Sequence, residues 1–182
     1  MTQARLVVVD MQHVFADPDS GWYVPRFAEV VKPVEALVAA FTPHVTFTRF
    51  VAPAQPEGAW IAYYERFPFA LEPPDAELYR LVPAIARHAS AGTLDAMTLS
   101  KWTPELAGAV GPGGELVVAG VATDSCVIGT ALAAADAGVH VRVPADACAG
   151  ADDDAHEHTL AVLRLWAPLI EVTGTARILA RA

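Results

Sequence analysis

Three reactive side chains follow short apolar runs of the sequence: Asp10, Lys101 and Cys126. Cys126 begins an alanine-rich helical stretch, where unpaired N–H groups and the positive end of the helix dipole favour a thiolate over a thiol. A thiol is mostly protonated at neutral pH, so a nucleophilic cysteine needs a base or a cation beside it. Asp10 would supply the base and Lys101 the cation. With this base and this cation beside it, the sulfur of Cys126 would attack a carbonyl carbon.

Each of these residues also has a plainer interpretation when taken alone. An aspartate after a strand often caps a loop or helix, a lysine is usually solvated, and a cysteine is often a small core residue. Their joint placement at the ends of strands is what favours a site. In open α/β sheets, ligands bind beyond the carboxyl ends of the strands.

The elements that must position these side chains are predicted from apolar runs and their boundaries. Short β-branched runs bounded by Gly, Pro or Asp predict six strands, at 4–12, 44–50, 95–100, 115–122, 139–144 and 168–173. Helical patterns cover 30–41, with Pro33 in the first turn, and also 76–88, 125–137 and 152–166. Alternating strands and helices predict an α/β fold in three α-β-α layers. Its mostly parallel six-stranded sheet would have a Rossmann-like order and helices on both faces.

One stretch fits none of these elements. Residues 51–75 are rich in proline and aromatic residues, and an insertion of this length in a compact α/β chain usually forms a lid or one wall of a pocket. We expect a single domain over 1–182 that carries this irregular insertion, since nothing in the composition marks a boundary.

Composition narrows the class of partner. The formal net charge of the 182 residues is −9, without a basic cluster, which argues against nucleic acid and anionic membranes. The apolar runs are too short to span a bilayer or to form a signal-peptide core, and two cysteines do not make a disulfide framework. These features predict a cytoplasmic protein that binds a small molecule and makes no membrane contact.

Three segments carry a resemblance to a known family. VVVDMQHVF (7–15), SKW (100–102) and VVAGVATDSCVIGTALAAADAGVHVRVPADACAG (117–150) resemble the isochorismatase-like cysteine hydrolases, which include nicotinamidases and N-carbamoylsarcosine amidases. The resemblance implies a catalytic Asp10, Lys101 and Cys126. It also implies a non-proline cis peptide between Val121 and Ala122, and an oxyanion hole made by the N–H groups of Ala122 and Cys126. Members of this superfamily are commonly oligomeric, so a homo-oligomer is expected.

The same motifs suggest which residues contact the substrate. Gln12 and Phe15 follow Asp10 at positions that match the family pattern, and Val121 precedes the expected bend. Trp102 beside Lys101, and Trp60, Tyr63 and Tyr64 in the insertion, are candidates for an aromatic wall. Aromatic residues in a long loop also serve to anchor it to the core, so both interpretations stay open.

Departures from the family pattern narrow the set of reactions that the chain is expected to catalyse. Nicotinamidases carry an Asp-x-His pair after the second strand that helps hold a metal, whereas here FTRFVAPAQPEG has no Asp or His after Thr48. We therefore expect no metal and no cofactor. His156 and His158 beside Asp152–Asp154 resemble a metal cluster only in composition, and an acid-capped helix start is favoured instead. Isochorismatases that cleave vinyl ethers often lack the cysteine, so Cys126 favours an amide, ureide or lactam.

Other hypotheses remain open at this stage. Asp10 and Lys101 could cleave a vinyl ether without covalent catalysis, with Cys126 incidental. Cys148 follows the fifth predicted strand and could form a reversible disulfide with Cys126, although no C-x-x-C spacing supports a redox protein. A nucleotide-binding module is disfavoured because the first strand leads into DMQHVF rather than a glycine-rich loop.

Overall fold

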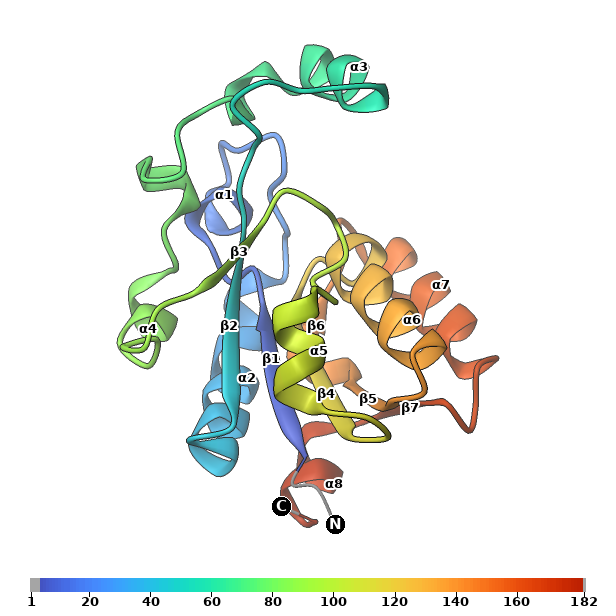
Figure 1. The fold of residues 1–182 in the computed structure, drawn as a ribbon. Helices are drawn as coiled ribbons and strands as arrows, with labels where there is room; N and C mark the ends of the chain where they lie inside the picture. Colours follow the sequence, from blue (N-terminus) through green and yellow to red (C-terminus); the bar gives the residue numbers. More distant parts are fainter. Residues whose placement is uncertain (1–3, 182) are drawn as a thin grey trace.

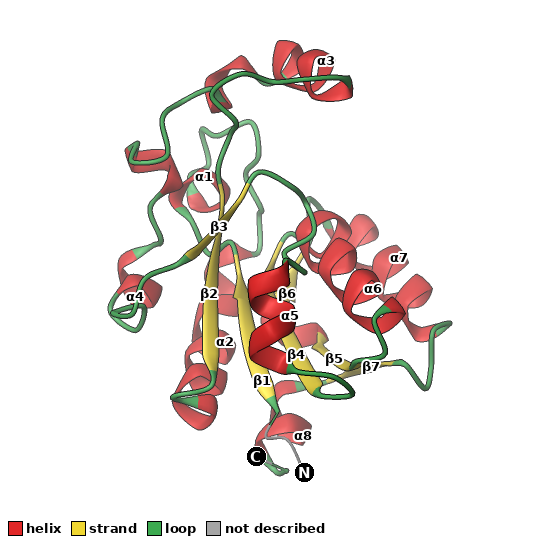
Figure 2. Cartoon of the chain, in the orientation of Figure 1, coloured by secondary structure: helices red, strands yellow, loops and turns green. Residues whose placement is uncertain are grey.

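A parallel sheet forms the centre of the computed structural model, which describes residues 4–181 (Figures 1 and 2). Six strands follow one another in the order β3-β2-β1-β4-β5-β7, and the short β6 pairs with β4. All of the pairings between these strands are parallel. The strands are β1 (Arg5–Val9), β2 (Val45–Phe50), β3 (Leu94–Ala96), β4 (Glu115–Val121), β5 (His140–Pro144), β6 (Cys148–Ala149) and β7 (Ile170–Thr173).

Helices cover both faces of this sheet, which confirms the predicted three-layer α/β fold (Figure 1). The helices are α1 (His13–Ala16), α2 (Phe27–Phe41), α3 (Ala59–Arg66), α4 (Pro83–Ala86), α5 (Pro104–Val110), α6 (Ile128–Asp136), α7 (Asp153–Arg164) and α8 (Thr175–Leu179). Apolar residues of α2, α4 and α8 pack on one face, and those of α5, α6 and α7 on the other. No helix among residues 4–181 is long and apolar enough to cross a membrane.

The central strand β1 shows why the sheet is buried on both sides. Leu6 and Val8 point into the core beneath α2, whereas Val7 and Val9 point into the core beneath α5 and α6. Successive residues of a strand face opposite sides, so a continuous apolar run is what a doubly covered strand requires.

Gly120 lets β4 lie close to β1. Its φ is +119°, a conformation that side chains rarely adopt, and a Cβ placed there would lie 2.1 Å from the carbonyl oxygen of Val9. The register also pairs Val9 with Gly120. The chain therefore has no room for any side chain at the point where β1 leads into Asp10.

The structure corrects several predicted elements. The helix predicted over 76–88 is wrong: it is replaced by a 3₁₀ turn at Glu77–Tyr79, a bridge between Leu81 and Gln12, and α4. Pro83 explains the break, because the residue before a proline is pushed into an extended conformation. Helix α2 begins at Phe27, three residues before the predicted start, so Pro33 lies in its second turn.

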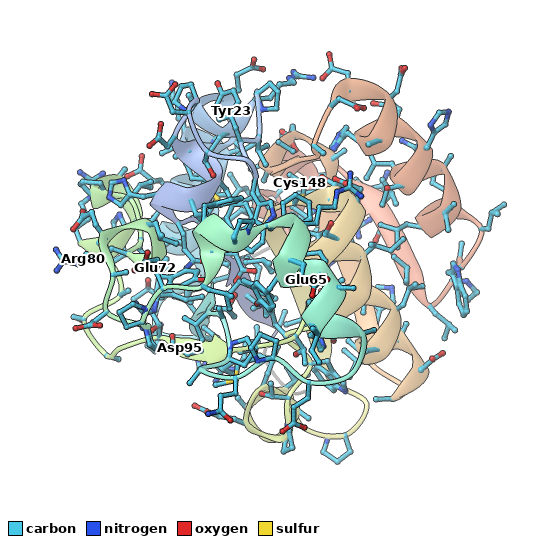
Figure 3. The ribbon with its side chains drawn as sticks, turned by 90° about the horizontal axis from the view of Figure 1, so that it is seen from above. Tyr23, Glu65, Glu72, Arg80, Asp95 and Cys148 are labelled. Carbon is cyan, nitrogen blue, oxygen red and sulfur yellow. The ribbon has the colours of Figure 1, made fainter. Side chains whose placement is uncertain are left out.

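The insertion over 51–75 is more regular than predicted, because it contains α3 and a 3₁₀ turn at Pro68–Ala70. Trp60, Tyr63, Tyr64 and Phe67 recur at helical spacing, and Tyr64 is buried in the core. In Figure 1 α3 lies above the carboxyl ends of the strands. In the view of Figure 3, α3, which carries Glu65, lies across the molecule. The insertion thus stands over the end of the sheet where ligands are expected.

Candidate active site

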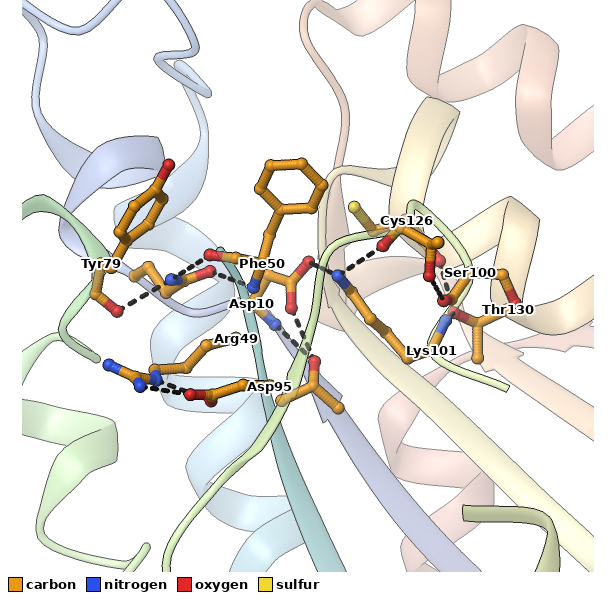
Figure 4. A network of polar contacts seen from close by, with 12 residues as sticks. Asp10, Arg49, Phe50, Tyr79, Asp95, Ser100, Lys101, Cys126 and Thr130 are labelled. Atoms are coloured by element: carbon orange, nitrogen blue, oxygen red, sulfur yellow. Dashed lines mark hydrogen bonds and ion pairs between the residues drawn. The ribbon is translucent and has the colours of Figure 1, made fainter. Parts of the chain in front are cut away.

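Asp10, Lys101 and Cys126 meet at the carboxyl ends of the central strands (Figure 4). Asp10 follows β1 directly, and Cys126 lies in the π-helical turn η3 (Thr123–Val127) that follows the neighbouring β4. Lys101 comes from the loop after β3. The Asp10 and Lys101 side chains are fully buried, and only 3% of Cys126 is exposed.

Asp10 is held on one side and open on the other. Its carboxylate Oδ1 accepts a 2.6 Å hydrogen bond from the Thr48 hydroxyl, whose oxygen in turn lies 3.3 Å from the Asp10 N–H that donates to it. Its backbone φ of +50° is unusual for a residue other than glycine. Oδ2 has no hydrogen-bond partner among the described residues, although the Lys101 ammonium lies 3.1 Å away. Apart from this ion pair, the oxygen is available to accept a proton.

Replacing Thr48 by valine tests how firmly Asp10 is held. Valine keeps the shape of threonine but leaves Oδ1 of a buried carboxylate without its donor, so we expect the free energy of unfolding to fall by about 1.5–3 kcal/mol. Urea denaturation at neutral pH would measure the loss. Thr46→Val, two residues earlier on β2, is the matched control and should cost much less. Equal effects of the two substitutions would contradict the role of Thr48.

The Lys101 ammonium group is surrounded by partners that suit a positive charge. Besides the ion pair with Asp10, it donates to the carbonyl of Thr98 at 2.9 Å and lies 4.8 Å from the centre of the Phe50 ring. The backbone N–H of Lys101 donates to the Thr130 hydroxyl, and that hydroxyl donates to the carbonyl of Cys126. The loop that carries the cation is thus tied to the turn that carries the thiol.

Burial raises the pKa of the Cys126 thiol well above its ordinary value, and the negative charge of Asp10 adds to this effect. The ammonium of Lys101 and a hydrogen bond from the Ala122 N–H to the sulfur act in the opposite direction without reversing the shift. The prediction that the start of a helix would favour the thiolate is therefore not supported for the resting site. The raised pKa favours a sulfur that keeps its proton beside the Asp10 carboxylate.

The raised pKa has a consequence for chemical modification. A higher pKa means a smaller thiolate fraction at any pH below it, so alkylation of Cys126 by iodoacetamide should accelerate steadily from roughly pH 7 to pH 9 without levelling off. Mass spectrometry on a Cys148→Ala variant, which keeps Cys126 as its cysteine, would follow the rate. A plateau below about pH 8 would show instead that Lys101 stabilises a resting thiolate.

The backbone beside the sulfur contains the cis peptide that the resemblance implies. The Val121–Ala122 peptide bond is cis. The carbonyl of Ala122 accepts from the N–H groups of Ser125 and Val127, each at 3.1 Å, and these residues stand on either side of Cys126. The Cys126 N–H is not among the donors to this carbonyl, and the Ala122 N–H faces the sulfur.

A family model confirms what the three segments of sequence suggest. The model of the isochorismatase domain matches residues 4–177. This chain belongs to the isochorismatase family. No curated protein matches it.

Solved structures of isochorismatase-like proteins share the fold. A cysteine hydrolase from Pseudomonas syringae pv. phaseolicola 1448A is 22% identical, with a TM-score of 0.85 over 99% of this chain and 92% of its own. An isochorismatase-like hydrolase from Alkaliphilus metalliredigens is 14% identical, with a TM-score of 0.78 over 99% and 98%. The nicotinamidase/pyrazinamidase PncA from Bacillus subtilis is 21% identical, with a TM-score of 0.75 over 94% and 99%.

A cavity of about 280 Å³ opens onto Cys126 of this isochorismatase-family chain. Two of the proposed substrate contacts, Phe15 and Tyr63, line it. Its other walls include Trp22, Phe50 and Phe67. Phe50 could have been found from its position at the end of a strand. Trp22 lies between a glycine and a tyrosine in a loop, and nothing in that sequence pattern indicates that it lines a cavity.

The remaining proposed contacts lie away from this cavity. The buried amide of Gln12 donates to the carbonyls of Phe50 and Tyr79 and accepts from the Phe50 N–H, so it fixes the end of β2. Val121 is buried in the sheet, while Trp60 and Trp102 pack against opposite cores. These four residues do not line the cavity, and neither does Tyr64, which is buried in the core.

The acidic stretch beside His156 is the start of a helix. The Asp152 side chain accepts from the Ala155 N–H at 2.7 Å and caps α7, while the His156 ring shares a hydrogen bond with Thr123 in the turn η3. Within residues 4–181 no group of three or more His, Cys, Asp or Glu side chains is arranged to hold a metal ion.

Proposed function

We propose that this chain is a cysteine-dependent hydrolase that cleaves a C–N bond of a small molecule through a thioester. The observation that carries the proposal is the buried ion pair of Asp10 and Lys101 beside a thiol that lines a cavity. A buried pair of charges is costly to maintain and is weak evidence for stability alone. A group with a shifted pKa beside a cavity, as Cys126 is here, is typical of active sites.

The first half of the reaction forms the thioester. The free oxygen of Asp10 takes the thiol proton as the sulfur of Cys126 attacks the carbonyl carbon, and Lys101 balances the negative charge on the sulfur. The N–H groups of Ala122 and Cys126 hold the oxyanion of the tetrahedral intermediate. Protonated Asp10 then returns its proton to the nitrogen, the C–N bond breaks, and the amine or ammonia leaves.

The second half restores the enzyme. Asp10, again a carboxylate, removes a proton from a water molecule that attacks the thioester carbonyl. The C–S bond breaks, the sulfur regains a proton, and a carboxylic acid leaves. The net change is hydrolysis of the amide by one water molecule. This sequence of steps is consistent with a resting thiol whose pKa is raised, because Asp10 needs to remove the thiol proton only when substrate is bound.

Cys148 is less suited to chemistry than Cys126. It is fully buried in the core, its sulfur donates to the Val118 carbonyl at 3.7 Å, and burial raises its pKa to about 12. Both cysteines are free thiols, and Cys148 does not line the cavity beside Cys126. These observations favour hydrolysis over a redox couple of the two cysteines.

A panel of primary amides, ureides and lactams tests the proposal, with detection of released ammonia or of new carboxylate. Rapid acid quenching followed by peptide mass spectrometry should find an acyl group on the peptide that contains Cys126. An acyl group on Cys148 would overturn the assignment of the nucleophile. Turnover without any adduct, unchanged in Cys126→Ala, would indicate acid catalysis by Asp10 and Lys101, as in cleavage of a vinyl ether.

A further inference from the structure

The turn η3 carries the groups that the proposed acylation needs in fixed positions, the Cys126 thiol and the backbone N–H groups beside it. The carbonyl of Ala122 accepts from the N–H groups of Ser125 and Val127, so hydrogen bonds within the turn set its shape. They do not set where the turn lies against the rest of the molecule. Donors to an oxyanion are effective when they are held in place before the reaction. Contacts from outside the turn must therefore fix its position.

One such contact comes from the loop that carries Lys101. The Thr130 hydroxyl accepts from the Lys101 N–H at 2.8 Å and donates to the carbonyl of Cys126 at 2.6 Å. These two bonds fix the end of the turn that carries the thiol. They leave its beginning, where the chain passes from Ala122 to Thr123, to be held by something else.

The beginning of the turn is held by α7 and the loop before it. The Thr123 hydroxyl shares a 2.9 Å hydrogen bond with Nδ1 of His156, and Oδ1 of Asp124 accepts from the Ala151 N–H at 2.9 Å. Thr123 is fully buried and His156 is 8% exposed. Burial lowers the pKa of His156, so its ring is neutral near pH 7 and pairs with the hydroxyl without placing a charge in the core.

The start of α7 lies tightly against the turn. A Cβ at Gly150 would lie 2.9 Å from Oδ1 of Asp124 and 3.0 Å from the backbone nitrogen of His156. Asp152 caps α7, so the helix begins at a defined place and presents His156 in its first turn. A side chain held in this way can transmit the position of the helix to Thr123.

His156 has no direct route to the substrate. Neither His156 nor Thr123 lines the cavity beside Cys126. His156 instead lines a different, polar cavity of about 380 Å³, together with Arg26, Glu157 and other residues. Any effect of its ring on the reaction must therefore pass through Thr123.

We propose that His156 is a positioning residue for acylation of Cys126: its ring holds Thr123 and so keeps the N–H groups of the oxyanion hole in place. This inference rests on the proposed function and adds a residue to it. The bond should matter when negative charge develops on a carbonyl oxygen. It should not matter in a reaction of the same sulfur that forms no oxyanion.

Two reagents separate these cases. With 4-nitrophenyl acetate, the sulfur attacks the ester carbonyl and an oxyanion forms; the C–O bond then breaks, 4-nitrophenolate leaves, and the thiol proton passes to Asp10. Iodoacetamide alkylates the sulfur by displacing iodide, without an oxyanion. Both rates are measured in a Cys148→Ala background, which leaves Cys126 of the two cysteines in the sequence. The rate with Cys126 also replaced by alanine is subtracted.

His156→Leu removes the hydrogen bond and fills much of the space of the ring. It should slow acylation at least about tenfold and change alkylation by less than about twofold. His156→Asn places an amide atom where Nδ1 stood and should restore acylation to within about threefold. His158→Leu, an exposed position on the same helix, is the control and should change neither rate. Equal slowing of both reactions in His156→Leu, or slowing of neither, would overturn the inference.

Thr123→Val removes the other end of the same hydrogen bond. It should slow acylation as much as His156→Leu, and the double variant should be no more than about twofold slower than either single variant, because both remove one interaction. Thr123→Ser keeps the hydroxyl and should react like the unaltered chain. Losses that multiply in the double variant would show that the two residues act independently, which would refute the proposed link.

Failure of the inference is distinguishable from failure of the proposed function. If no amide of the panel is hydrolysed but the two reagents respond as expected, C–N hydrolysis is wrong and the role of His156 stands. If amides are hydrolysed through Cys126 and acylation in His156→Leu is undiminished, only the inference is wrong. If iodoacetamide modifies Cys126 but 4-nitrophenyl acetate does not, both are overturned.

Discussion

Cys126→Ala should abolish hydrolysis, with kcat reduced at least about 10⁴-fold on any amide that the unaltered chain cleaves. The substitution removes the atom that forms the thioester, and Asp10 and Lys101 then have no nucleophile to activate. Ammonia release under saturating substrate measures the loss. Because the substitution only replaces the SH group by hydrogen, the fold should be retained, which circular dichroism and thermal denaturation would verify.

Cys148→Ala is the matched control for this experiment. It removes the other buried thiol, which donates to a backbone carbonyl and does not line the cavity, so kcat should stay within about twofold of the unaltered chain. Full activity in Cys126→Ala would refute covalent catalysis. Loss of activity in Cys148→Ala without loss of stability would instead indicate that the two thiols act together.

Lys101→Met should lower both stability and activity. Methionine fills much of the space of the lysine stem, but the substitution leaves the buried carboxylate of Asp10 without its cation. Breaking a buried ion pair in this way typically costs 3–5 kcal/mol of unfolding free energy, so we expect a loss of about that size in urea denaturation. Activity should fall as well, because nothing then balances the charge that develops on the sulfur.

The double variant Asp10→Asn with Lys101→Met separates the two effects. Neutralising both members of the pair removes the uncompensated charge, so most of the lost stability should return. Activity should not return, since asparagine cannot accept the thiol proton. A double variant as unstable as Lys101→Met alone would show that the two charges do not stabilise one another, and recovered activity would refute the role of Asp10 as the base.

Much of the fold could be predicted from the sequence because the strands of a doubly covered sheet are continuous apolar runs. The runs that end at Asp10 and lead into Cys126 are such strands, and parallel strands present their carboxyl ends at one edge. That rule alone placed two of the three reactive residues together. The strand predicted over 95–100 was expected to lead directly into Lys101, but β3 ends at Ala96 and a loop carries the lysine to the site.

The region between Val51 and Leu94 was predicted poorly because tertiary contacts decide its structure. The bridge between Leu81 and Gln12 replaces a predicted helix, and α3 lies among prolines that suggested an irregular chain. The aromatic spacing of Trp60 and Tyr63 did carry a helical signal. Which of these rings would face a cavity could not be inferred, because that depends on Trp22, which comes from a different loop.

The state of the thiol shows a limit of local reasoning. The position of Cys126 at the start of a helical stretch favours a thiolate, but a helix dipole acts over a short range and competes with desolvation. In the folded chain Cys126 is 3% exposed and its sulfur lies beside a carboxylate, and these two effects raise the pKa of the thiol. Burial and neighbouring charge are properties of the assembled site, so the sign of the shift could be read only from the structure.

The contact of Gly120 with Val9 has a consequence for how this chain can vary. Even alanine at position 120 would force β1 and β4 apart at the point where one strand delivers the base and the next delivers the nucleophile. A library of all twenty amino acids at this codon, selected for growth on an amide as nitrogen source, should therefore return glycine alone. Neighbouring core positions such as Val118 should accept other aliphatic residues.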